Sequence, residues 1–153
     1  MAITAADMTV TITEAVTLNG AARGNTNTLT ISNIHEVVER TVTVPASEVE
    51  LIAMGTAVSS GTFIEGDVRY IRITNKDATN HIVLTFKSEN NHEFAVKVDK
   101  GQSFIYNGDL SGGVVDTMDA SASALTVALE DLVNITAVAD TAACDVEFMV
   151  ACV

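Results

Sequence analysis

The chain of 153 residues has no tryptophan, one proline, two cysteines and only eight basic residues. Its aromatic residues are five Phe and two Tyr, so aliphatic side chains must fill the core and few rings are left to stack on a sugar. Twenty acidic residues against eight basic ones give a net charge of −12, which repels phosphate backbones and anionic lipids. The composition therefore argues against nucleic-acid and membrane-surface partners.

Signals for a membrane or for secretion are also missing. No apolar run approaches the roughly 18 residues of a membrane-spanning helix. Residues 1–15 lack the basic and apolar segments of a secretory signal. Cys144 and Cys152 lie eight residues apart in one expected strand, about 27 Å when extended, which is too far for a mutual disulfide. We expect both to be buried small side chains in a reducing cytosol, without redox or metal roles.

Small and β-branched residues are abundant. Apolar residues make up 48% of the chain, and Ala (20), Val (20) and Thr (19) dominate. This proportion favours pleated sheet over helix. Alternation of apolar and polar residues predicts strands at 8–13, 28–32, 37–44, 70–74, 81–87, 93–98, 103–106 and 145–150.

The clearest stretch spans residues 68–87, where two alternating runs flank the polar turn NKDATN. This pattern predicts a β-hairpin, with Ile71 and Ile73 on one buried face. Residues 19–27 and 107–124 are rich in Gly and polar residues and are expected to be loops. Residues 45–57 are compatible with a strand or a short helical turn.

The stretch after residue 124 leaves two alternatives open. It permits a helix through Leu125, Leu129 and Leu132, or a strand around Ile135. The whole pattern predicts an all-β fold: a β-sandwich or jelly roll of eight to ten short antiparallel strands, with at most one short helix, in a single domain spanning 1–153.

No reaction motif is present. The chain has three histidines, His35, His81 and His92, and none lies beside a nucleophile in a motif such as the G-x-S-x-G nucleophile elbow. We expect these histidines in turns or facing solvent. Cysteines and histidines show no zinc spacing, and the sequence has no phosphate-binding loop. Arg69 and Arg72 have opposite parity in one strand and should form no basic patch. We assign no catalytic, cofactor-binding or metal-binding residue.

One loop leaves a structural cation open as an alternative. Asp109, Asp116 and Asp119 share a Gly-rich tract, and carboxylates on a flexible loop suit calcium. Their spacing matches no EF-hand, however, and acidic loop residues are ordinary in so acidic a chain. The prediction is therefore that no cofactor is bound.

Three passages carry a family resemblance. RYIRITNKDATNHIVLTF, FAVKVDKGQSFIYN and ITAVADTAACDVEFMVA resemble the small β-sandwich structural proteins of tailed bacteriophages. The resemblance implies a virion protein that is made in the host cytoplasm and has no catalytic residues.

Within that family the resemblance implies either a capsid cement or decoration subunit or a neck, tail or fibre component, and we favour the cement role because the chain is one compact domain without a long fibrous repeat. Such a subunit would bind the major capsid protein and form a homo-oligomer, with a trimer favoured. The first alternative is a tail, neck or fibre component. A carbohydrate-binding module stands third, because Tyr70 and Tyr106 are the only tyrosines and Trp is absent. A cupin-like enzyme would need paired metal-binding histidines, which the sequence lacks.

Overall fold

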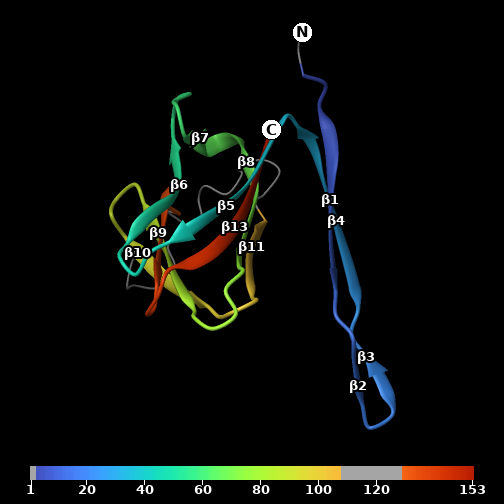
Figure 1. Ribbon diagram of the computed structural model, residues 1–153. Coiled ribbons are helices and arrows are strands. Elements are labelled where there is room, and N and C mark those ends of the chain that lie inside the picture. The colour runs from blue at the N-terminus through green and yellow to red at the C-terminus, as the bar shows by residue number, and fades with distance from the viewer. Residues whose placement is uncertain (1–2, 108–128) are drawn as a thin grey trace.

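The computed structural model describes residues 3–107 and 129–153, which form thirteen strands and one short 3-10 helix, η1 (Glu65–Asp67) (Figure 1). The strands are β1 (Ala6–Thr13), β2 (Val16–Leu18), β3 (Ala21–Arg23), β4 (Thr26–Ile34), β5 (Glu36–Val44), β6 (Val49–Gly55), β7 (Thr62–Ile64), β8 (Val68–Asn75), β9 (Ile82–Ser88), β10 (Glu93–Val98), β11 (Ser103–Asn107), β12 (Leu132–Ala139) and β13 (Cys144–Cys152). The predicted all-β class is confirmed.

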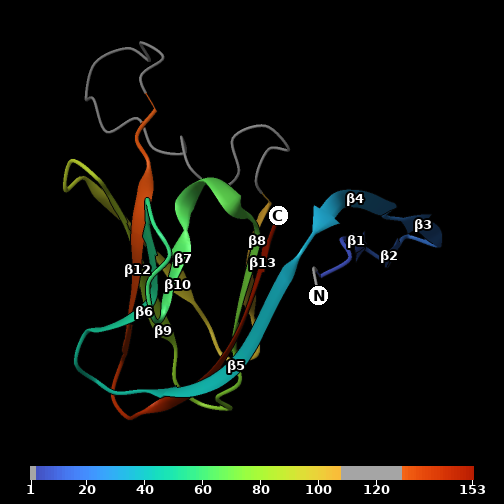
Figure 2. The same cartoon turned by 90° about the horizontal axis from the view of Figure 1, so that it is seen from above.

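Nine of these strands form two sheets that pack face to face (Figure 2). One sheet has the order β10-β9-β12-β6-β7, and the other has the order β11-β8-β13-β5. Neighbours are antiparallel except for β6 and β7, which run parallel. The prediction of a sandwich is thus confirmed, and the remaining four strands lie outside it.

The core follows the predicted alternation. Aliphatic side chains from both sheets are fully buried between the layers, and they include Ile71, Ile73, Ile82, Leu84, Ile135, Val146 and Val150. Phe86 is the largest of the fully buried side chains and stacks on Phe94 with centroids 4.7 Å apart. In the absence of tryptophan, branched aliphatic residues fill most of the interior.

The predicted hairpin at 68–87 is wrong in its pairing. Both runs are strands, but β8 pairs with β11 and β13, whereas β9 pairs with β10 and β12. Residues 76–81 therefore cross from one sheet to the other. Side-chain alternation identifies the buried face of each strand, but it carries no information about which strand lies alongside.

Two ambiguous stretches are resolved as strands. Residues 45–57 contain β6, and the region around Ile135 is β12, which begins at Leu132. Residues 108–128, and with them Leu125 and most of the expected 107–124 loop, lie outside the described residues. The loop expected at 19–27 is wrong in part, because it contains β3 and the start of β4.

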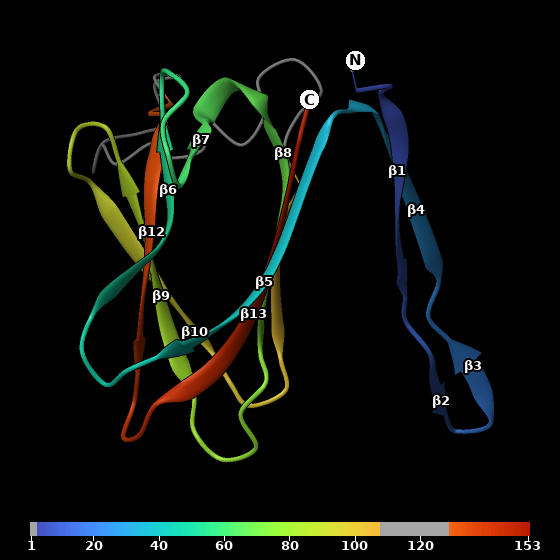
Figure 3. The same cartoon turned by 45° about the horizontal axis from the view of Figure 1, so that its top comes forward.

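Strands β1–β4 form a two-stranded arm, residues 6–34, that lies against the outer face of the four-stranded sheet (Figures 1 and 3). Figure 2 shows three layers in sequence: the five-stranded sheet, the four-stranded sheet and the arm. Only His35 separates β4 from β5, so the arm leads directly into the edge strand of the sandwich.

Candidate assembly interface

The arm has two chemically different faces. In the β1–β4 ladder three threonine pairs lie opposite each other, and in two of them the hydroxyl oxygens approach: Thr11–Thr28 at 3.5 Å and Thr13–Thr26 at 3.3 Å. The opposite parity is apolar and carries Met8, Val10, Ile12, Leu29 and Ile31. A strand pair with one apolar face requires a surface to cover that face.

The tip of the arm, residues 14–25, is a tight hairpin. Asn19 and Gly20 both have positive φ, 51° and 79°, as a two-residue hairpin turn of the primed type requires. Gly24 allows the tip to join the longer ladder, since a Cβ there would lie 2.1 Å from the carbonyl oxygen of Glu14. The Glu14 N–H donates to the carbonyl oxygen of Asn25 at 2.9 Å, which closes this junction.

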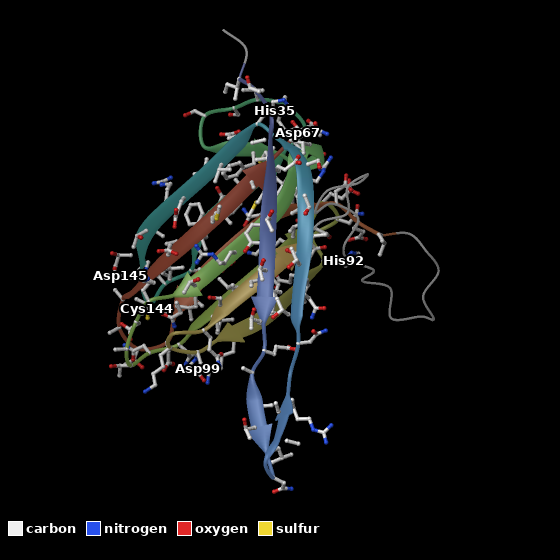
Figure 4. The ribbon with its side chains drawn as sticks, turned by 90° about the vertical axis from the view of Figure 1, so that its right-hand side faces the viewer. His35, Asp67, His92, Asp99, Cys144 and Asp145 are labelled. Carbon is white, nitrogen blue, oxygen red and sulfur yellow. The ribbon has the colours of Figure 1, made fainter. Side chains whose placement is uncertain are left out.

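The root of the arm is held on the sandwich by a small second core. Val10, Ile31 and Ile34 are buried against Tyr70 and Ala151, with three further side chains partly buried around them: Met8, Met149 and Val153. The His35 N–H also donates to the carbonyl oxygen of Cys152 at 2.9 Å. Figure 4 shows the arm crossing the strands of the sheet from this root, which lies near His35.

The arm is longer than the sheet on which it lies. From Ala6 to Asn19 an extended strand covers about 43 Å, whereas β13, from Cys144 to Cys152, covers about 27 Å. Figures 1 and 4 both show the tip projecting beyond the end of the sandwich. The chain's own sandwich therefore covers the root of the arm and leaves the tip uncovered.

Many of the exposed apolar side chains lie on the arm. Ten large hydrophobic side chains are exposed in the described residues, and four of them lie on the arm: Ile12, Val16, Leu18 and Leu29. Val16 and Leu18 at the tip are 58% and 61% exposed. Residues 3–34 contain only three charges, on Asp7, Glu14 and Arg23. An apolar, nearly uncharged projection on so acidic a protein has the character of an interaction surface.

The sheet face beside the arm is polar and satisfied by its own ion pairs. An Arg72 Nη atom lies 2.8 Å from a Glu147 carboxylate oxygen and another lies 3.6 Å from Glu39. Lys76 approaches the second oxygen of Glu147 at 3.7 Å. The hydrogen bond from Arg72 is the main reason why the pKa of Glu147 is lowered. Besides Val37 and Ile105 on this sheet face, the exposed large apolar side chains on this side of the molecule are the four of the arm.

A groove opens between the edges of the two sheets, where β5 faces β7. It has a volume of about 270 Å³, and its apolar walls are Val38, Leu51, Phe63 and Phe148. Arg40 lines it as well, with its guanidinium carbon 6.0 Å from the centroid of the Phe148 ring. Arg40 shares the core-facing parity of Val38 and Val42, so it is a charged residue at an inward position of an edge strand.

The three histidines lie in separate places and form no common site. His35 links β4 to β5, and the His81 ring lies 3.6 Å from Asp140. The Nδ1 atom of His92 lies 2.8 Å from Glu130, which also accepts a hydrogen bond from the Ser88 hydroxyl at 2.5 Å. The Ser88 and His92 contacts, in that order, lower the pKa of Glu130. Figure 4 shows how far His35 and His92 lie apart.

The remaining residues singled out in the sequence are two arginines, a tyrosine and the aspartates of the Gly-rich tract. Tyr70 is buried beneath the arm, so it offers no platform for a sugar. Arg69 is buried and donates to the carbonyl oxygen of Gly66 at 2.7 Å, whereas Arg72 lies on the outer face. Among residues 3–107 and 129–153 no group of three His, Cys, Asp or Glu side chains is arranged to hold a metal ion. Asp109, Asp116 and Asp119 lie outside the described residues.

Both cysteines are free and buried at the two ends of β13. Burial raises the pKa of both thiols, and that of Cys152 reaches about 12. We therefore expect no labelling by a thiol reagent at pH 8 in the native protein and two labelled thiols per chain in denaturant. Rapid labelling without denaturant would contradict this assignment.

The same pKa shift predicts how stability depends on alkaline pH. A folded pKa of about 12 lies above the unfolded value of about 8.5, so the folded state holds the proton more tightly. The contribution of Cys152 to stability should be complete below pH 8.5 and should fall as the pH rises towards 12. Denaturant titrations of Cys152→Ala should show a weaker loss of stability between pH 9 and 11 than those of the unmodified chain.

Comparison with protein-family models and with curated proteins finds no match. Among solved structures, a protein of the Bacillus endospore appendages, described as a family of disulfide-linked pili, matches with a TM-score of 0.49 and 16% identity. The match covers 76% of this chain and 82% of that chain. In the described residues no helix is long and apolar enough to cross a membrane.

Proposed function

We propose that this protein is a non-enzymatic structural subunit that joins other copies of itself through its N-terminal arm. The overhang of the arm carries the proposal. A projection with an apolar face, three charges and a tip that its own sandwich does not cover gains stability only when another surface covers it. The turn at Asn19 and Gly20 closes the tip into a formed hairpin before binding, and a preformed hairpin lowers the entropic cost of association.

We further propose that the assembly is a phage virion, with the chain as a capsid cement or decoration subunit. The sequence resemblance supports this role, and the arm provides the means of spanning from one subunit to the next. The acidic surface also suits this position, because a net charge of −12 would face solvent and avoid packaged DNA. A place in the tail, neck or fibre is the alternative, since the same arm would serve there.

Removing the apolar character of the tip tests the assembly role. The double variant Val16→Asp/Leu18→Asp places two charges on side chains that are more than half exposed, so the fold should remain intact. We expect the unmodified protein to form oligomers and the variant to be a monomer of 16.1 kDa by light scattering.

A matched control places the same charges on the other face of the arm. Thr11 and Thr13 have the same two-residue spacing as Val16 and Leu18, but they lie on the threonine face. Thr11→Asp/Thr13→Asp should keep its oligomeric state. An unmodified protein that remains monomeric at high concentration would overturn the proposed self-assembly.

The place on the virion needs a separate measurement. Purified protein should bind phage capsids that lack it and raise the temperature at which those capsids rupture. The favoured stoichiometry is three copies at each local threefold axis. Binding to tails and not to heads would replace the cement role with the tail alternative.

A further inference from the structure

We propose that the tip of the arm binds in the groove between β5 and β7 of a second copy, so that subunits join head to tail. This inference rests on the proposed self-assembly and names the two surfaces that meet. The first argument is that the groove lies at an unfinished edge. β5 and β7 are the last strands of their sheets, and β7 has only three residues against nine in β5. Val38, Leu51 and Phe63 in its walls are therefore only partly buried, whereas Phe148 at its floor is covered.

The tip of the same chain is badly placed to fill this groove. The groove lies near the root of the arm, because Glu36 and Val38 at the start of β5 line it. The tip lies at the other end of the molecule, beyond the sandwich, as Figures 1 and 4 show. A second copy placed beyond the tip would instead present its own groove to the incoming arm.

The size of the groove suits the tip. Val16 and Leu18 lie two residues apart on one face of β2 and are the most exposed apolar side chains of the arm. An apolar cavity of about 150 Å³ holds one benzene ring. The groove, with about 270 Å³, has room for two aliphatic side chains of this size.

The charges of the two surfaces are complementary. The tip carries Glu14 and Arg23, and the groove carries Glu36 and Arg40. None of these four side chains makes an ion pair in the described residues, although eight such pairs are found elsewhere. Arg40 at an inward edge position also discourages indiscriminate pairing with other strands. It therefore favours a partner that brings an acidic residue beside its apolar ones, as the tip does with Glu14.

A contact between two different surfaces fixes the kind of assembly. Head-to-tail contacts give a closed ring when the rotation between neighbours closes, and a filament when it does not. The favoured trimer would be the ring that closes after three copies. In either form each subunit contributes one tip and one groove.

Mixing two defective variants tests the inference directly. The tip variant Val16→Asp/Leu18→Asp keeps its groove, and the groove variant Arg40→Glu/Ser59→Trp keeps its arm. Arg40 and Ser59 are exposed, so both chains should fold. Each variant alone should be a monomer, and an equimolar mixture should give a dimer of twice the 16.1 kDa chain mass and nothing larger. Only one tip and one groove remain functional in that mixture.

Controls separate the inference from the proposed function. Lys100→Glu makes the same charge change as Arg40→Glu at an exposed turn and should assemble normally. If the groove variant assembles as the unmodified chain does, or if the mixture stays monomeric, the groove is not the receptor, although self-assembly through the arm survives. If the unmodified chain does not assemble at all, the proposed function itself fails. Should the Trp substitution disturb folding in a thermal melt, Arg40→Glu alone replaces the groove variant in the same mixture.

Discussion

Replacing Ile73 with aspartate is expected to lower the free energy of unfolding by more than about 4 kcal/mol, because the substitution both removes a core side chain and buries a charge. Ile73 is fully buried in the middle of β8, where it packs in the core between the two sheets. A domain of this size is stabilised by roughly 5–15 kcal/mol in total. The variant should therefore be largely unfolded near 37 °C, and a denaturant titration followed by circular dichroism measures the loss.

Two substitutions in the same sheet serve as controls. Ile105→Asp makes the same chemical change on the neighbouring strand β11, where the side chain is 38% exposed, and should cost about 1 kcal/mol or less. Thr74→Ala, on the opposite parity of β8, removes hydroxyl contacts with Arg72 and Ser103 and should cost about 1 kcal/mol. Equal destabilisation by Ile73→Asp and Thr74→Ala would show that the assignment of the buried face is wrong.

The sequence was informative about strands and faces, because burial of one side of a strand leaves a period of two in the residues themselves. The alternation predicts a buried face with Ile71 and Ile73, and both are buried. The sequence does not show which strands pair with each other. β8 and β9 are separated by only six residues, but they belong to different sheets, and the partner strand β13 lies some seventy residues further along the chain. Nothing local in the sequence encodes that long-range contact.

The sequence does not predict the arm, for a related reason, although it contains one signal for it. Asn19-Gly20 between two alternating runs is a strong hairpin signal, but the surrounding Gly and Asn residues suggested a loop. The position of the arm could not be inferred, since its root packs on Tyr70 and Ala151, far away in sequence. The candidate interface follows from the mismatch between arm length and sheet length, which becomes visible only when both are folded.

The groove was equally inaccessible to the sequence. Its walls come from β5, β6, β7 and β13, and it exists because two sheet edges happen to lie opposite each other. Arg40 was the one local hint, since it interrupts the apolar parity of Val38, Val42 and Val44. A single charged residue within an alternating strand is common at edges, so this interruption by itself indicates an edge strand and not a binding site.

Asn75→Ala is the second substitution for which we expect a large loss of stability, and it acts through the connections between the sheets. The Asn75 side chain is fully buried, and its amide nitrogen donates to the carbonyl oxygens of Asn80 at 2.9 Å and Val98 at 3.3 Å. Its side-chain oxygen accepts the Asp77 N–H at 3.0 Å. One residue thus ties the β8–β9 crossing to the end of β10.

The backbone of Asn75 extends this network to the next connection. Its N–H donates to the carbonyl oxygen of Gln102 and its carbonyl accepts the N–H of Gly101, both at 3.0 Å. The 76–81 crossing and the turn before β11 are therefore fixed to each other at this residue.

Truncation to alanine would leave three backbone groups without their hydrogen-bond partner: the carbonyl oxygens of Asn80 and Val98 and the N–H of Asp77. Each group that no water reaches lowers the free energy of unfolding by about 1–3 kcal/mol. Because water can reach some of these groups in a surface connection, we expect a total loss of about 3 kcal/mol. Denaturant titration measures it, and Asn107→Ala, at the exposed end of β11, is the matched control that should cost less than about 0.5 kcal/mol. Hydrogen exchange adds a local readout, since the amides of Asp77 and Gly101 should lose protection together in Asn75→Ala. Equal stability of the Asn75→Ala and Asn107→Ala variants would mean that the crossing between the two sheets is held by its strands alone.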